Sequence, residues 1–402
     1  MGDHRRDLGG TIPKKYAQPI YAHYPAGCCH GLDLLVSDVP LMVMQGARIG
    51  VTENAGFGRE FHRLKATLAA GVSVLAGSAF AAKKVEPIKY WDDHAGFGYV
   101  GPQDVDLLDE WRSAGVNYLS INVGYDPVPW STTIRAIADY TKGIEARSDM
   151  VLCSTFSQVL AAWYAGQMAL TFDIEGMGAL NGDVSMVELY YRLGVRQMLI
   201  AYNLNNEAGG GCHDEDKGLT DFGRAVVRDM NRVGMVVDCA HSGIKSGLEA
   251  MRLSTKPCIF SHANARALHE HERNITDEQI KAVAATGGVV GVNGYNQFLG
   301  DGAAKVESMV AHIDYMAKLV GADHVGIGLD YDPSTGAALD EATSAKYWPA
   351  RQYPASIKEE YLSPSILPQV SEQLRSLGYN ESSIRAIMSG NFMRVASQVW
   401  AR

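Results

Sequence analysis

The sequence has no cysteine pair with CxxC spacing, no block of lysines and arginines, and no hydrophobic tail at its end, SQVWAR. The first absence leaves a structural zinc ribbon without support. The second, together with a net charge of −9 and an isoelectric point near 5.7, argues against a nucleic-acid partner. The third leaves no signal for a lipid anchor. With 47% hydrophobic and 20% charged residues, the composition also excludes collagen, coiled coils and disordered chains.

The chain is long enough to bury a large core. Its 402 residues allow two or three domains of average size, and they also fit a single α/β barrel with additional segments. The 42 glycines indicate many tight loops between regular elements. The length therefore leaves the number of domains open, and the pattern of apolar segments has to decide it.

Residues 60–81 show, in order, the features of a secretory signal peptide. A basic segment, HRLK at 62–65, precedes an uncharged apolar run at 66–80. The run closes on AFA at 79–81, which has the small-x-small pattern of a cleavage site. It is shorter than the ~20 residues that a helix needs to span a bilayer. We therefore expect cleavage near Ala81 and a periplasmic or secreted protein with no stable membrane anchor; a buried helix of the domain is the alternative.

Signal peptides stand at the N-terminus of a protein, yet residues 1–59 precede this one. The simplest explanation is that translation starts near Met44 or Val51 and that the N-terminus is over-extended. Residues 1–59 would then not belong to the mature protein. The remaining residues, 82–402, contain no low-complexity linker, so we expect them to form a single domain.

Four cysteines lie in the predicted mature part: Cys153, Cys212, Cys239 and Cys258. An exported location permits disulfides. Cys239 and Cys258, however, lie inside apolar strand-like runs, where a buried free thiol is the common state. We therefore expect these two to be free.

Eight short apolar runs follow the predicted signal, with helix-like segments between them. Because the runs are rich in β-branched residues and nearly continuous in apolar character, they predict parallel strands covered on both faces. They lie at 88–93, 116–123, 169–174, 195–201, 234–240, 257–260, 288–293 and 324–329. The helical patterns lie at 103–114, 183–193, 220–233, 243–253, 276–286 and 304–321, with capping residues at Thr220 and Thr276. This alternation predicts a (β/α)8 TIM-type barrel with extra C-terminal helices in 355–402; a doubly wound open sheet is the alternative.

Polar side chains follow nearly all of the predicted strands. In such a barrel the C-terminal strand ends lie together and carry the active site. The residues at these positions are His94, Glu175, Tyr202, Asn203, His241, His262, Tyr295 and Asp330. Three histidines and two carboxylates from separate strands can converge on one divalent cation, and they suit zinc or a neighbouring first-row metal. Such a metal lowers the pKa of its water to about 7, and Asp330 can accept the proton as a general base.

Each of these residues also has a structural interpretation. A single histidine after an apolar strand is as often a hydrogen-bonded structural residue as a ligand. Asp330 and Glu175 can belong to turns, and Tyr202 and Tyr295 can belong to the packing. The coincidence of position on separate strands favours the functional interpretation, because structural residues would not require it.

Several segments of the sequence occur together in a recognisable order. They are IEG at 174–176, GVRQMLIAYNLNN at 194–206, GLTDFGRAVVRDMNRVGMVVDCAHSG at 218–243, PCIFSHANARAL at 257–268, ERNITDEQI at 272–280, GGVVGVNGY at 287–295, HVGIGLDYD at 324–332 and GNFMRV at 390–395. As an ordered set they resemble the renal (membrane) dipeptidase family, a branch of the metal-dependent amidohydrolase superfamily. The resemblance runs from about residue 88 to residue 399. It implies a (β/α)8 barrel that hydrolyses dipeptides, commonly with two zinc ions.

The resemblance also implies roles for the metal-binding residues. Glu175 matches the glutamate that bridges the two metals. His241 and His262 match the pair that holds one zinc, and His94 matches a ligand of the other.

Four further positions are implied to act on the substrate. Arg273 matches the arginine that binds the terminal carboxylate, a task for which a planar guanidinium is suited. Asp330 matches the aspartate that takes the proton of the attacking water and passes it to the leaving amine. Tyr295 and Asn205 are expected to contact the substrate.

Two positions depart from the family pattern. The family has His-x-Asp after the first strand, with both side chains on the second zinc, whereas this chain keeps His94 and has Gly96. A family histidine that polarises the scissile carbonyl aligns with Tyr202, whose phenol can still donate a hydrogen bond to an oxyanion. We therefore expect one firmly bound zinc. The second position should be weak or empty unless Asp92, Asp93 or water substitutes.

Three functions are compatible with this sequence. The first is an exported zinc dipeptidase that acts on small peptides with a free carboxylate. The second is a related amidohydrolase that acts on another amide or ester as a tailoring enzyme. The third is a catalytically inactive binding homologue. A homodimer is expected only from the resemblance.

Overall fold

The computed structural model describes residues 87–97, 102–300, 302–333 and 339–400. The predicted signal peptide at 60–81 and the segment 1–59 lie outside the described residues, so both remain predictions. Among the described residues, no helix combines the length and the apolar character that crossing a bilayer requires. Within the same residues the cysteines are free thiols, and Cys239 and Cys258 are buried, as predicted.

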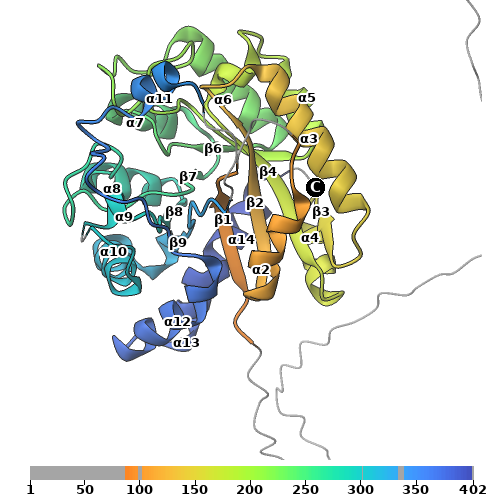
Figure 1. Ribbon diagram of the computed structural model, residues 1–402, viewed down its shortest axis with the longest axis vertical. Helices are drawn as coiled ribbons and strands as arrows, with labels where there is room; N and C mark the ends of the chain where they lie inside the picture. Colours follow the sequence, from red (N-terminus) through yellow and green to blue (C-terminus); the bar gives the residue numbers. More distant parts are fainter. Residues whose placement is uncertain (1–86, 98–101, 301, 334–338, 401–402) are drawn as a thin grey trace, which may run out of the picture. The chain divides into compact units, whose positions relative to one another are not determined.

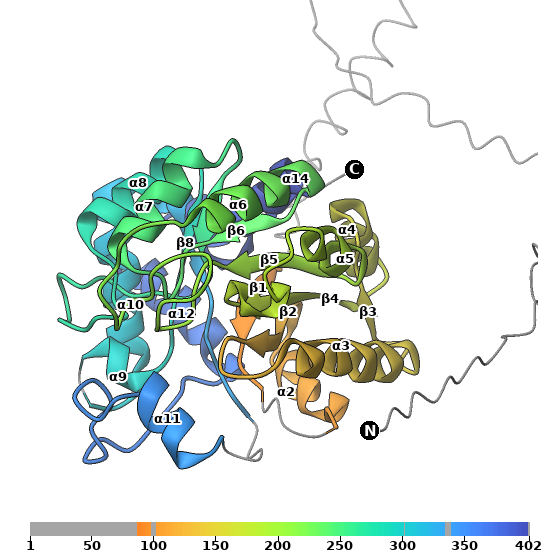
Figure 2. The ribbon, with the colours of Figure 1, turned by 90° about the horizontal axis from the view of Figure 1, so that it is seen from above.

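Eight parallel strands form a barrel that is surrounded by helices (Figures 1 and 2). In spatial order they are β1 (Tyr90–Ala95), β2 (Val116–Tyr125), β4 (Met168–Glu175), β5 (Val195–Leu199), β6 (Val236–Asp238), β7 (Cys258–Phe260), β8 (Val289–Val292) and β9 (Val325–Ile327). The barrel closes where Ala95 bridges Tyr331 and where the Asp330 N–H donates to the His94 carbonyl at 3.1 Å. The structure therefore confirms the (β/α)8 barrel and not the open sheet.

Each predicted apolar run overlaps one strand of this barrel. The strands are almost entirely buried, because one face lines the barrel and the other lies under helices. The sequence prediction missed β3 (Met150–Leu152), which pairs with the start of β4, while β5 pairs with its later residues. With three residues, β3 is too short for its periodicity to be recognised.

The predicted helices are present, with bounds that differ by a few residues. They are α2 (Asp109–Ser113), α5 (Met186–Arg192), α6 (Asp221–Val233), α7 (Ile244–Leu253), α8 (Asp277–Ala285) and α10 (Val306–Val320). The Thr220 and Thr276 hydroxyls accept hydrogen bonds from the first turns of α6 and α8, so both predicted caps are confirmed. The structure adds helices that the prediction lacked: α3 (Trp130–Glu145), α4 (Phe156–Tyr164), α9 (Asn296–Leu299) and α11 (Glu341–Tyr347).

Three helices lie near the C-terminus, and the last of them, with the residue that follows it, closes the barrel at the N-terminal ends of its strands. They are α12 (Leu367–Ser376), α13 (Glu381–Arg385) and α14 (Asn391–Val399), of which α14 lies behind the strands in Figure 1. Phe392 and Trp400 belong to one buried cluster with Trp91 and Tyr118 from the first residues of β1 and β2. A Cβ at Gly326 would lie 2.4 Å from a ring carbon of Phe392, so only glycine allows this contact. This end of the barrel is therefore a closed apolar layer.

Candidate metal centre

Five predicted site residues meet at the opposite end of the barrel. Glu175 ends β4, while His241 and His262 follow β6 and β7. Their Nε2 atoms lie 3.2 and 3.3 Å from Glu175 Oε1. His94 of β1 places its Nε2 3.5 Å from the same oxygen and 3.5 Å from Oδ1 of Asp330, which follows β9. The structure thus brings together the three histidines and two carboxylates that the sequence predicted to converge.

The second ring nitrogen of each histidine has a partner. His94 Nδ1 lies 3.1 Å from Asp173 Oδ1, and His241 Nδ1 lies 2.6 Å from Asn203 Oδ1. Because these oxygens accept, each Nδ1 donates its hydrogen and leaves the Nε2 lone pair toward the centre. His262 Nδ1 lies 2.8 Å from Ser261 Oγ. Partners of this kind orient histidine ligands in metal sites.

The inward-facing nitrogens fit a cation. His241 Nε2 and His262 Nε2 are 2.9 Å apart, so two lone pairs would face each other without a positive charge between them. His94 Nε2 is buried and has no hydrogen-bond partner among the described residues. Ligand atoms of His94, His262 and Glu175 all lie within 4.8 Å of one another, and imidazoles beside a carboxylate are a donor set that binds zinc or a neighbouring metal.

Burial shifts the pKa values of the carboxylate and the histidines of this centre. It raises the pKa of Glu175 well above the usual range, an effect that His94 opposes. Burial lowers the pKa of His241 and His262 well below the usual value, with nearby positive charge adding to the effect. For His94 burial acts in the same direction, but Asp173 and Glu175 outweigh it and the pKa rises. A bound dication would favour ionised Glu175 and neutral histidines.

The backbone is strained at three positions of the site. Asn203, His241 and Asp330 have φ angles of 58°, 58° and 55°. Residues other than glycine adopt this left-handed conformation rarely, at a cost of about 1–3 kcal/mol each. They are three of the four non-glycine residues with positive φ in the described part of the chain. Because this backbone conformation is unfavourable in itself, we infer that it is kept at Asn203, His241 and Asp330 to direct their side chains into the site.

The predicted substrate residues differ in how close they lie to the centre. Arg273 is buried, donates from Nη2 to the His262 carbonyl at 3.2 Å, and lies over the Phe298 ring at 5.2 Å. The Tyr202 ring stacks on the His241 ring, with centroids 4.1 Å apart. Asn205, in contrast, is exposed and bonds within its own loop, donating to the Glu215 carbonyl at 3.0 Å. The structure does not bring Asn205 into the centre.

Tyr295 lies at the edge of the site, after β8. Its ring stacks on Tyr361 with centroids 4.6 Å apart, and its hydroxyl accepts a hydrogen bond from Gln297 at 2.8 Å. Both contacts come from neighbouring loop residues. The Glu359 side chain is a further hydrogen-bond partner of the Tyr295 hydroxyl, and this bond raises the tyrosine's pKa beyond the effect of burial.

Sequence reasoning missed Asp173, which contacts His94. Asp173 is fully buried and accepts hydrogen bonds from Ser120 Oγ at 2.6 Å and Asn122 Nδ2 at 2.9 Å as well as from His94. It lies two residues before Glu175 on β4, so strand periodicity places both on the same face and could have revealed it. Asn203 was noted as a polar residue after its strand, but its role in orienting His241 was not assigned from the sequence.

A partly buried aspartate connects two loops of the site. Asp126 accepts hydrogen bonds from the backbone N–H of Gly178 at 2.8 Å and of Tyr202 at 2.9 Å. Burial raises its pKa to about 6. Gly176 packs against it so closely that a Cβ there would lie 2.2 Å from a carboxylate oxygen. Asp126 therefore sets the position of the turn after Glu175 relative to Tyr202.

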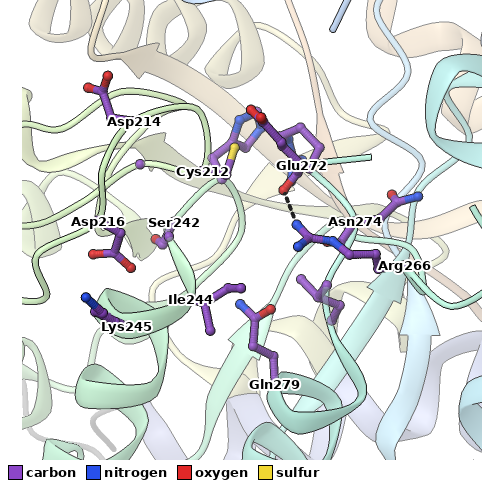
Figure 3. A pocket seen from close by; sticks show the side chains of 15 residues that line it. Cys212, Asp214, Asp216, Ser242, Ile244, Lys245, Arg266, Glu272, Asn274 and Gln279 are labelled. Atoms are coloured by element: carbon purple, nitrogen blue, oxygen red, sulfur yellow. Dashed lines mark hydrogen bonds between the residues drawn. The ribbon is translucent and has the colours of Figure 1, made fainter. Parts of the chain in front are cut away.

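A cavity of about 280 Å³ lies beside the centre, and both His241 and Arg273 line it. Figure 3 shows its charged side chains, with Arg266 directed toward Glu272. Arg266 donates to backbone carbonyls, and Asp216 accepts from Ser246 in the first turn of α7. These charges therefore hold the loops around the cavity together.

A profile of the membrane dipeptidase family, peptidase family M19, matches residues 130–347, which is more than half of the chain. The chain belongs to the membrane dipeptidase family. The matched range contains the predicted site residues apart from His94, and Gly96 also precedes it. The recognised resemblance is thus confirmed, and this family member is a metal-dependent hydrolase of the dipeptidase type.

Individual proteins show the same relationship. An uncharacterized protein from the region 5′ of pqqA in Klebsiella pneumoniae is 30% identical over 245 residues, 58% of this chain and 83% of that protein. An uncharacterized dipeptidase of Schizosaccharomyces pombe is 33% identical over 175 residues, 42% of either chain. Among solved structures, an amidohydrolase of Pseudomonas aeruginosa is similar with a TM-score of 0.72 and 28% identity, over 78% of this chain and 97% of that one.

Proposed function

We propose that this family member is an exported zinc dipeptidase that hydrolyses small peptides with a free carboxylate. The observation that carries the proposal is the convergence of three imidazole Nε2 atoms on Glu175 Oε1, at 3.5, 3.2 and 3.3 Å. Nitrogen ligands beside a carboxylate suit zinc, whereas magnesium and calcium prefer oxygen ligands. Glu175, His241 and His262 would hold the firmly bound zinc, with His94 beside them. A bound zinc lowers the pKa of water to about 7 and so supplies a nucleophile at neutral pH.

Asp330 is placed to move the proton. Its Oδ2 accepts a hydrogen bond from Asn293 Nδ2 at 2.8 Å, so Oδ1 is the oxygen that faces the centre. Burial raises the pKa of Asp330, although His94 and Arg273 oppose the rise. A general base works best when its pKa approaches the working pH. Asp330 can therefore accept the proton of the attacking water at Oδ1 and return it to the leaving amine.

Arg273 is the group for the substrate carboxylate. Its Nη2 is fixed by the His262 carbonyl, and its Nε is buried without a partner among the described residues. A guanidinium binds carboxylates through paired N–H donors. The His262 carbonyl holds Arg273 next to a metal ligand. The segment from His262 to Arg273 would therefore set the distance between the free carboxylate of a bound peptide and the metal.

Tyr202 favours a second candidate function, hydrolysis of a different amide or of an ester. Burial raises the pKa of Tyr202 well above its usual value, so the phenol stays neutral. It can donate a hydrogen bond to an oxyanion, but it cannot supply the positive charge of the imidazolium that the resemblance implies for the family. A substrate with a more reactive carbonyl needs this charge less.

The test is a combined measurement on the purified chain. Zinc per chain is measured by elemental analysis, and the same sample is assayed against a panel of dipeptides and against N-acyl amides and esters. Bound zinc with turnover of dipeptides supports the proposal. Zinc with turnover of the other substrates alone supports the second candidate. Absence of metal and of turnover would overturn both and favour an inactive binding homologue.

Export needs a separate measurement, because the signal lies outside the described residues. The protein is recovered from the periplasm and medium of cells that express the full gene, and its N-terminus is sequenced. We expect the mature chain to begin directly after Ala81. An intact N-terminus in a cytosolic fraction would contradict export and leave the enzymatic proposal unaffected.

A further inference from the structure

We propose that Asp332 supplies the carboxylate of a second metal position, in place of the aspartate that the family has where this chain has Gly96. The proposal rests on the proposed function and extends it to the number of metals. Its starting point is the closure of the barrel: the Gly96 N–H donates to the Tyr331 carbonyl at 3.1 Å, and Ala95 bridges Tyr331. Gly96 follows Ala95, and Asp332 follows Tyr331. Because Ala95 and Tyr331 are paired, Gly96 and Asp332 lie on two adjacent segments.

The space beside Gly96 is where Asp332 lies. A Cβ built on Gly96 would be 3.4 Å from Asp332 Cβ and 3.8 Å from the Asp332 carboxyl carbon. The same Cβ position is 3.9 Å from Asp330 Oδ1, which faces the centre. An aspartate at residue 96 would extend its carboxylate from this point into the site. The Asp332 carboxyl borders the same region from the opposite strand.

A ligand that would share this second position is already in place. His94 Nε2 is fully buried, lacks a hydrogen-bond partner among the described residues, and lies 3.5 Å from Glu175 Oε1. Burial raises the pKa of Tyr125, and both Glu175 and Asp332 raise it further. His94, Glu175 and Asp332 together give one nitrogen and two carboxylate ligands, which suits zinc, manganese or cobalt.

The two aspartates that precede His94 are engaged elsewhere. Asp92 accepts hydrogen bonds from Trp111 Nε1 at 2.8 Å and from the Leu329 N–H at 2.8 Å. Asp93 Oδ1 accepts from Trp91 Nε1 at 2.7 Å, while its Oδ2 is buried without a hydrogen-bond partner among the described residues. Trp91 belongs to the apolar cluster at the N-terminal end of the barrel, so Asp93 is directed away from the metal centre. Asp92 and Asp93, which the sequence suggested as substitute ligands, are therefore less suited to this position than Asp332.

The test counts metal ions and does not depend on activity. The full chain is stripped with a chelator, titrated with Co²⁺ or Zn²⁺, and analysed for metal per chain after gel filtration. We expect two cations per chain, with the second bound more weakly. Asp332→Asn should weaken the second position at least tenfold and leave the first unchanged, since a lost carboxylate ligand costs no less than a lost partner of a ligand. Asp323→Asn, an exposed aspartate near the same strand, is the matched control and should change neither.

A double variant makes the test specific. Gly96→Asp in the Asp332→Asn background moves the carboxylate from one segment to the other, and it should restore the second cation. A second position that survives Asp332→Asn would overturn the proposal, as would a wild-type chain that binds one cation only. The one-cation result would leave the proposed hydrolase function intact, whereas a chain without any bound cation would contradict that function as well.

Discussion

The two ends of the barrel are built from the same strands and are chemically opposite. At the N-terminal end, Trp91 and Tyr118 stack with ring centroids 3.5 Å apart and pack under α14 in an apolar layer. At the C-terminal end, buried histidines and carboxylates face one another across strained backbone. Apolar burial at the N-terminal end stabilises the fold. This stability offsets the cost of strained backbone and buried polar groups at the C-terminal end, where the active site lies.

The largest effect should come from the active end. Asp330→Asn keeps the shape of the side chain but cannot accept a proton, so turnover should fall roughly 10²- to 10⁴-fold. Metal content and thermal stability should stay close to those of the wild type, because the Asn293 contact is on the other oxygen. The measurements are kcat on a dipeptide and zinc per chain. Retained activity would show that another group moves the proton.

At the apolar end we expect the opposite result, a loss of stability with activity and metal content unchanged. Phe392 is buried against Gly326, and Phe392→Ala would leave a cavity that costs about 3–5 kcal/mol of unfolding free energy. Activity per folded molecule and metal stoichiometry should not change. Denaturant unfolding followed by circular dichroism gives the free energy. A loss of metal in the folded variant would mean that the two ends are coupled, and the comparison would fail.

An intermediate effect is expected at the residue that links the strands to the metal. Asp173→Asn removes the carboxylate charge behind His94 and should lower the affinity for the cation beside His94 roughly 10- to 100-fold. Competition with a chromogenic chelator measures this affinity, with Asp323→Asn as the control. If the affinity is unchanged, His94 is oriented by the strand alone.

The smallest effect should come from the substrate clamp. Arg273→Lys keeps the charge and loses the paired donors, so KM for a dipeptide should rise on the order of tenfold with kcat nearly constant. A C-terminally amidated substrate is the internal control, because it has no carboxylate to bind. Equal losses on both substrates would show that Arg273 acts through the structure around His262.

The sequence predicted the barrel because parallel strands buried on both faces leave continuous apolar runs, and each of the eight runs overlaps a strand. It could not predict β3, whose three residues carry no period. Metal ligands such as His241 were predictable since they stand directly after strands. Asn203 was also noted after its strand, but its contact with His241 was not predictable, because the contact depends on a left-handed turn. The relation of Gly96 to Asp332 depends on how the barrel closes, which no local pattern encodes.

The closure of the barrel also determines when the metal site can exist during synthesis. His94 leaves the ribosome early and Asp330 late, and the bridge between Ala95 and Tyr331 joins segments from either end of the described chain. Until the second of these segments has emerged, the polypeptide presents only a partial set of ligands, and α14 follows later still. The proposed position beside His94 therefore has its full set of ligands only late in synthesis, whereas Glu175, His241 and His262 are all present earlier.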